Sequence, residues 1–142
     1  MTLSFRYKSI QRSKGSVKAP HIPVNLISKS LMSIEFIALL DSGADVSIIP
    51  KDVAELLGID LTKERDISRG IGGEIEVINT KININIRKGH ESYDLTIPVQ
   101  VALNGNTIPV ILGRAGFFDK FKITFDQSNE LVSLKRVLEN KY

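Results

Sequence analysis

The feature that most constrains the fold is an apolar run that ends on a carboxylate. Residues 36–40 are Phe-Ile-Ala-Leu-Leu, and Asp41, Ser42 and Gly43 follow directly. A short apolar run of this kind predicts a buried strand. A carboxylate at the end of such a strand is costly unless it is hydrogen-bonded or functional. Because Asp, Ser and Gly are also common turn formers, a plain strand and turn stays open from these residues alone.

The composition is typical of one globular domain. The chain has 142 residues, of which 42% are hydrophobic, enough for a sizeable core. It contains no cysteine, which excludes disulfides and thiolate metal sites. The first residues form no long apolar segment, so we expect neither a signal peptide nor a membrane span, and we expect a cytoplasmic protein.

Basic residues gather near the start of the chain. The net charge is +3, but residues 1–34 carry +6 and no acidic residue, so the remainder carries −3. The six cations are Arg6, Lys8, Arg12, Lys14, Lys18 and Lys29. A basic end can attract nucleic acid. No aromatic-rich RNA-binding pattern accompanies these charges, so we expect a solvated face and no nucleic-acid partner.

Short alternating stretches predict a protein built mainly of strands. They cover residues 3–7, 24–28, 34–40, 46–49, 74–78, 82–86, 95–101 and 108–113, with a closing hairpin over 122–126 and 131–134. A helix is expected over residues 50–58, between a proline and a glycine, with Val53, Leu56 and Leu57 as its buried stripe. One or two helical turns are expected over 114–121, and Asn104-Gly105 predicts a turn. The pattern indicates an all-β barrel or sandwich.

A glycine-rich stretch, Gly70-Ile71-Gly72-Gly73, lies between strand-like flanks. It predicts a hairpin tip with a mobile backbone. The spacing differs from G-x-G-x-x-G and a strand follows in place of a helix, so we expect no nucleotide-binding loop here.

Carboxylate chemistry is what the remaining motifs favour. His21 and His90 lie in separate loop-like stretches without zinc-binding spacing, and G-x-S-x-G is absent. Peptide hydrolysis by carboxylates needs two of them, one as general base and one protonated. The chain holds one Asp-Ser-Gly, so the second carboxylate could come from a second copy across a two-fold axis.

Three stretches together resemble the retropepsin family of aspartic proteases: residues 38–45, 70–73 and 111–114, the last leading into a short helix. The resemblance spans roughly residues 22–126. It implies a small closed acid-protease barrel with one or two short helices and a flap hairpin, active as a homodimer. We therefore expect one domain over residues 1–142, with its core at about 22–126, a basic N-terminal extension at 1–21 and a C-terminal hairpin and tail at 122–142.

The resemblance also implies roles for individual residues. Asp41 would be the catalytic carboxylate, with Ser42 bracing the paired loops and Gly43 bringing backbone close to the substrate. Substrate-binding positions would be Ala44, Asp45, Gly70, Ile71, Gly72, Gly73, Ile108, Pro109, Val110 and Ile111. Structural support would come from Leu112, Gly113 and Arg114, with Arg114 in a partly buried pair with Asp45. No metal or organic cofactor is implied.

These observations predict an aspartic endopeptidase that cleaves peptides or proteins between apolar residues, because Ile71, Ile108 and Ile111 would supply apolar walls. Two alternatives stay open. One is a peptide-binding domain that kept the fold without activity. The other is a nucleic-acid-binding β-barrel that uses the basic N-terminal segment.

Overall fold

Twelve strands make up most of the chain in this computed structural model, which describes residues 2–70, 72–104 and 108–138. In chain order they are β1 (Thr2–Arg6), β2 (Lys8–Arg12), β3 (Gly15–Ala19), β4 (His21–Ile27), β5 (Ser33–Leu40), β6 (Ser47–Pro50), β7 (Arg65–Gly70), β8 (Gly73–Lys88), β9 (Glu91–Ala102), β10 (Val110–Leu112), β11 (Phe121–Asp126) and β12 (Leu131–Arg136). A helix, α1 (Lys51–Leu56), follows β6, and a 3₁₀ turn, η1 (Phe118–Lys120), precedes β11. The predicted all-β class is confirmed.

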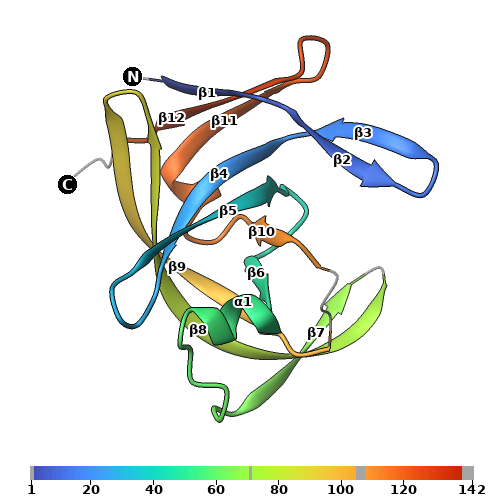
Figure 1. Cartoon of the computed structure of the whole chain (residues 1–142), viewed down its shortest axis with the longest axis vertical. Coiled ribbons are helices and arrows are strands. Elements are labelled where there is room, and N and C mark those ends of the chain that lie inside the picture. The colour runs from blue at the N-terminus through green and yellow to red at the C-terminus, as the bar shows by residue number, and fades with distance from the viewer. Residues whose placement is uncertain (1, 71, 105–107, 139–142) are drawn as a thin grey trace.

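The largest sheet closes on itself to form a barrel (Figure 1). Its strand order is β4-β5-β10-β6-β9-β8-β7, and β4 also pairs with β8, which joins the two sides and leaves β7 outside the closed part. Two of the pairings are parallel, β5 with β10 and β6 with β9. Because parallel neighbours run the same way, β5 and β10 deliver their C-terminal ends to the same place.

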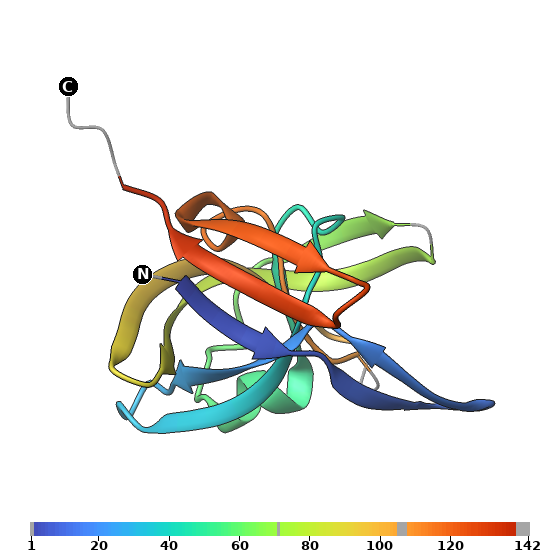
Figure 2. The ribbon, with the colours of Figure 1, turned by 90° about the horizontal axis from the view of Figure 1, so that it is seen from above.

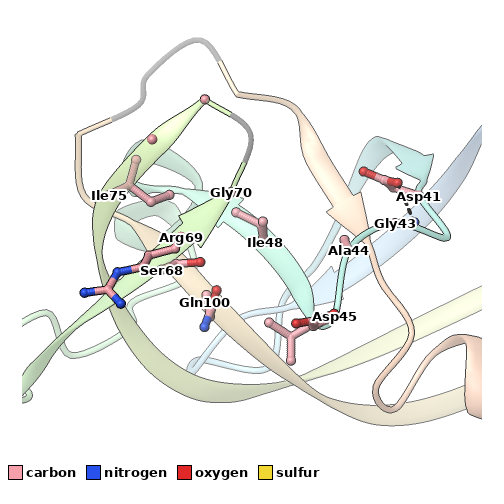
Figure 3. A pocket seen from close by; sticks show the side chains of 13 residues that line it. Asp41, Gly43, Ala44, Asp45, Ile48, Ser68, Arg69, Gly70, Ile75 and Gln100 are labelled. Atoms are coloured by element: carbon pink, nitrogen blue, oxygen red, sulfur yellow. Dashed lines mark hydrogen bonds between the residues drawn. The ribbon is translucent and has the colours of Figure 1, made fainter.

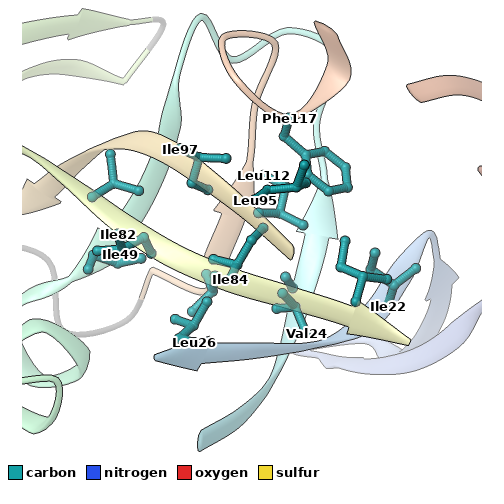
Figure 4. Packing of buried hydrophobic residues seen from close by; sticks show 14 of the residues in the cluster. Ile22, Val24, Leu26, Ile49, Ile82, Ile84, Leu95, Ile97, Leu112 and Phe117 are labelled. Atoms are coloured by element: carbon teal, nitrogen blue, oxygen red, sulfur yellow. The ribbon is translucent and has the colours of Figure 1, made fainter. Parts of the chain in front are cut away.

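The core fills this barrel with side chains from alternate positions of its strands. Along β4, Ile22, Val24 and Leu26 are buried, and along β8 the same holds for Ile82, Ile84 and Ile86. Figure 4 shows the labelled side chains of β4 and β8 in one cluster that also holds Leu95, Leu112 and Phe117. The period of two that predicted the strands therefore also determines which side chains are inside.

The start and the end of the described chain meet in a second sheet, ordered β1-β12-β11 (Figure 2). In it Leu3 and Phe5 of β1 are buried in the common core, beside Val132 and Leu134 of β12. The segments expected to flank the core, residues 1–21 and 122–142, thus join each other through β1 and β12.

Residues 8–19 form a two-stranded ribbon, β2 with β3, that projects from the body of the molecule in both views (Figures 1 and 2). Sequence analysis predicted no strand over these residues. A reason for the miss is that the ribbon has no buried face: nearly all of its residues are exposed, with Ile10 opposite Val17 as its apolar pair.

The helix α1 buries a different stripe from the one predicted. Val53 and Leu57 are buried as expected, but Leu56 is 60% exposed, and Ala54 is buried in its place. At 100° per residue, positions 53, 54 and 57 share one arc, while position 56 lies outside it. The helices in the described part of the chain have six and three residues, and none is long and apolar enough to cross a membrane.

The expected glycine hairpin is formed by β7 and the first part of β8, with Gly70 opposite Gly73. The alternating stretches 74–78 and 82–86 prove to be one continuous strand, β8, of 16 residues. Ile71 and part of the predicted Asn104-Gly105 turn lie outside the described residues.

Candidate active site

The Asp41 carboxylate lies at the C-terminal end of β5, half-buried. The parallel partner β10 fixes its backbone, because the Asp41 N–H donates to the carbonyl oxygen of Leu112 at 3.0 Å. On the other side, the Leu40 N–H donates to the carbonyl oxygen of Pro20 at 3.1 Å. The strand that carries the carboxylate is thus held by backbone bonds from both neighbours.

A tight turn over residues 41–44 orients this carboxylate. Asp41 Oδ1 accepts a hydrogen bond from the Gly43 N–H at 2.9 Å, and the Ala44 N–H donates to the Asp41 carbonyl oxygen at 3.2 Å. A Cβ atom at Gly43 would lie 3.2 Å from that same Oδ1. Within the described residues, Oδ2 of Asp41 has no hydrogen-bond partner, so one oxygen is fixed and the other can meet a ligand.

The segment after β10 holds the loop from behind. The Arg114 and Ala115 N–H groups each donate at 2.9 Å, to the carbonyl oxygens of Ala44 and Asp45 respectively. The Gly113 N–H donates to the buried hydroxyl of Ser47 at 3.0 Å. A side chain at Gly113 has no room, since a Cβ there would lie 2.5 Å from the carbonyl oxygen of Val46.

Arg114 and Asp45 form the ion pair expected between them. Sequence reasoning expected this pair to be partly buried, but in the single chain the two side chains are 54% and 86% exposed. An exposed pair contributes only about 0–1 kcal/mol. Its backbone neighbours, rather than the charges, hold the loop within one chain.

A cleft of about 610 Å³ lies between this loop and the glycine hairpin (Figure 3). The loop contributes Asp41, Gly43, Ala44, Asp45 and Val46 to its wall. The opposite wall comes from the hairpin and comprises Ser68, Arg69, Gly70, Gly72, Gly73 and Ile75. Ile48 of β6 and Gln100 of β9 also line the cleft. Its volume lies in the range of clefts that bind organic ligands.

The structure brings only part of the expected substrate-binding set to this cleft. The residues 43–45 and the described glycines of the hairpin line it, whereas Ser42 is exposed outside its wall. The segment 108–111 is not in the wall: Val110 is buried in the core, Pro109 is exposed, and Ile108 and Ile111 are half-buried. Ile111 nevertheless lies next to the cleft, because it pairs with Ile48, which lines it. Ile71 lies outside the described residues.

Sequence reasoning missed several residues that line the cleft: Val46, Ile48, Ser68, Arg69, Ile75 and Gln100. For Gln100, the sequence did contain a pattern that indicates the direction of its side chain. Gln100 is the polar residue between Val99 and Val101, both of which are buried, so alternation places its side chain on the face opposite the core.

Neither histidine lies in the cleft wall. His21 is buried beside Leu39, and burial lowers its pKa below the ordinary value of 6.5. His90 is exposed at the turn between β8 and β9. Among the described residues, no three His, Asp or Glu side chains converge on a point that could hold a metal ion.

Comparisons with known proteins agree on one fold. A family model described as "Aspartyl protease" matches residues 31–115. A retropepsin-like aspartic protease from Rickettsia conorii has 22% identity and a TM-score of 0.59, with 94% of this chain and 98% of that chain covered. The retroviral protease-like domain of Ddi1 from Leishmania major has 18% identity and a TM-score of 0.53, with 86% and 96% covered. At these identities the two structures establish the fold alone, and no curated protein matched the sequence significantly.

Proposed function

The chain belongs to the aspartyl protease family, and from this we propose that it is an endopeptidase that acts as a homodimer. The observation that carries the proposal is Asp41 itself. It is half-buried in the wall of a cleft of about 610 Å³, with one carboxylate oxygen fixed by Gly43 and the other without a partner in the described residues. A carboxylate held in this way can act on a water molecule.

The dimer follows from the need for two carboxyl groups. One chain supplies a single Asp-Ser-Gly, so a two-fold axis beside the loop would bring the second one. Two adjacent carboxyl groups share one proton, because both cannot ionise cheaply. Ser42, exposed at the loop surface, is free to brace the partner loop.

In the reaction, the ionised Asp41 removes a proton from water while the water oxygen attacks the peptide carbonyl carbon. The protonated Asp41 of the partner subunit donates its proton to the carbonyl oxygen. The tetrahedral intermediate then breaks at the C–N bond, and the leaving nitrogen takes the proton that Asp41 received from water. As the carbonyl bond of the new carboxyl group forms, one hydroxyl of the intermediate returns a proton to Asp41 of the partner subunit, so both carboxyl groups regain their starting states. The glycine hairpin would act as a flap over the peptide, and Arg114 with Gly113 would hold the loop in place.

The test is turnover of a peptide library by the purified chain and by Asp41→Asn, with the association state followed by sedimentation. We expect cleavage by a dimer and its loss in Asp41→Asn. Asp60→Asn is a matched control, because Asp60 also accepts a hydrogen bond from the N–H two residues on, Thr62, at 2.9 Å, but lies outside the cleft wall. Cleavage by Asp41→Asn, or by a strict monomer, would contradict the proposal, and peptide binding without cleavage would favour the non-catalytic alternative.

A further inference from the structure

One polar side chain of the cleft wall, Gln100, comes from β9 and not from the loop that carries Asp41. Gln100 sits on β9 opposite Ile48 of β6 and Asn79 of β8. It is half-buried, and it lines the cleft. Within the described residues its side-chain amide has no hydrogen-bond partner. One acceptor oxygen and one NH₂ group are therefore available to a ligand.

A second uncharged polar group faces it from the hairpin. Ser68 lies opposite Ile75 in the β7–β8 ladder, and both line the cleft. In Figure 3 the Ser68 hydroxyl lies on the same side of the hairpin as Gln100. In the same view Ile48 lies between Gln100 and Asp41. The Ser68 hydroxyl also lacks a partner among the described residues.

The charged groups that border this region are already paired. Arg69 contacts Glu74 across the hairpin at 2.8 Å, and its side chain is 79% exposed. Asp45 is paired with Arg114. A charged ligand side chain would thus find no free counter-charge among these groups, whereas a neutral hydrogen-bonding side chain would find both donors and acceptors.

We infer that Gln100 and Ser68, between the apolar walls of Ile48 and Ile75, form an amide pocket that binds an asparagine or glutamine side chain of the substrate. This inference rests on the proposed function and names its substrate class. An amide side chain can both donate to and accept from Gln100, and it leaves neither group unpaired. A leucine of similar shape would desolvate Gln100 without replacing its hydrogen bonds. Because Ile48 separates the pocket from Asp41, the selected residue is not the one whose carbonyl is attacked.

The experiment compares peptide substrates that differ at one position, with asparagine or leucine in turn at each position around the cleaved bond. At one position the wild-type chain should cleave the asparagine peptide with about tenfold higher kcat/KM than the leucine peptide. Gln100→Leu should abolish or reverse this preference while still cleaving the leucine peptide. Ser68→Ala should reduce it by a smaller factor.

Two controls keep the result interpretable. Asn79→Leu changes the neighbour of Gln100 on β8, which is not in the cleft wall, and should leave the preference unchanged. Circular dichroism and thermal melting check that each variant folds, and if Gln100→Leu does not fold, Ser68→Ala carries the test.

The outcomes separate the two proposals. Cleavage that needs Asp41 but favours leucine at every position overturns the amide pocket and leaves the proposed function standing. A preference for asparagine that neither Gln100→Leu nor Ser68→Ala alters also overturns it. If no peptide is cleaved in an Asp41-dependent way, the proposed function fails and the amide pocket falls with it.

Discussion

One methyl group at position 113 should disturb the candidate active site from behind. In Gly113→Ala, the new Cβ would lie 2.5 Å from the carbonyl oxygen of Val46, 2.6 Å from its carbonyl carbon and 2.9 Å from the carbonyl oxygen of Ala44. All three are backbone atoms of the segment that follows Asp41. The clash is therefore relieved only by moving that segment away from β10.

The size of the effect follows from these distances. The shortest contact is about 1 Å inside the optimal separation of about 3.5 Å. Overpacking of this kind costs about 1–3 kcal/mol. The same displacement would lengthen the bond from the Gly113 N–H to Ser47 Oγ, and a buried N–H left unpaired costs about 1–3 kcal/mol. We expect a loss of about 3 kcal/mol in the free energy of unfolding, which lowers Tm by about 10 °C in a chain of this length.

Urea denaturation and thermal melting measure this loss, and peptide turnover reports the displaced loop. Gly70→Ala is a suitable control for stability, because a Cβ there meets no atom within 4 Å and its backbone is not left-handed. A Gly113→Ala chain within about 0.5 kcal/mol of wild type, with full turnover, would refute the reasoning.

Three further predictions concern charge and pH. Arg114→Lys should change the free energy of unfolding of the single chain by less than about 1 kcal/mol, because the pair with Asp45 is exposed. It should weaken dimerisation and turnover together, because lysine lacks the planar fork of arginine. A fully dimeric and active variant in sedimentation and activity assays would contradict this. Burial lowers the pKa of His21 below 6.5, so the unfolded chain takes the proton first and stability should fall as the pH drops below 6.5. His21→Gln should flatten that dependence in urea titrations at several pH values, and an unchanged slope would contradict the assignment to His21. Ala44→Ser would add a hydroxyl that can donate to the Asp41 carboxylate and should move the acid limb of the pH–activity profile lower; an unchanged profile would reject this.

The strands and their inward faces could be predicted because each depends on local alternation. Ile82, Ile84 and Ile86 alternate in the sequence and are buried in the barrel. Alternation could not find the ribbon of residues 8–19, because neither of its faces is buried. The predicted buried stripe of the helix was wrong at Leu56, because a six-residue helix presents only a narrow arc of its surface to the barrel.

For the site, the contiguous turn at Asp41 was accessible from sequence because its geometry is set by adjacent residues. Alternation over residues 99–101 indicated which face of the strand carries the Gln100 side chain, but neither Gln100 nor Ser68 could be placed in the cleft from sequence, because the β6–β9 and β7–β8 pairings bring them there from distant parts of the chain. The segment 108–111 was expected there, but the inward alternation of β10 buries Val110 in the core.

The pairing of β1 with β12 has a consequence for how the chain acquires its structure. Ser4 and Ser133, hydrogen-bonded side by side, are 129 residues apart in the sequence. Contacts of such separation slow folding, because the loop between them must be ordered before they form. During synthesis β1 is made before β12 and stays without this partner until residues 131–136 have been made. The sheet that β1 completes therefore cannot form before β12 has been made, and any activity that depends on this sheet would also wait for β12.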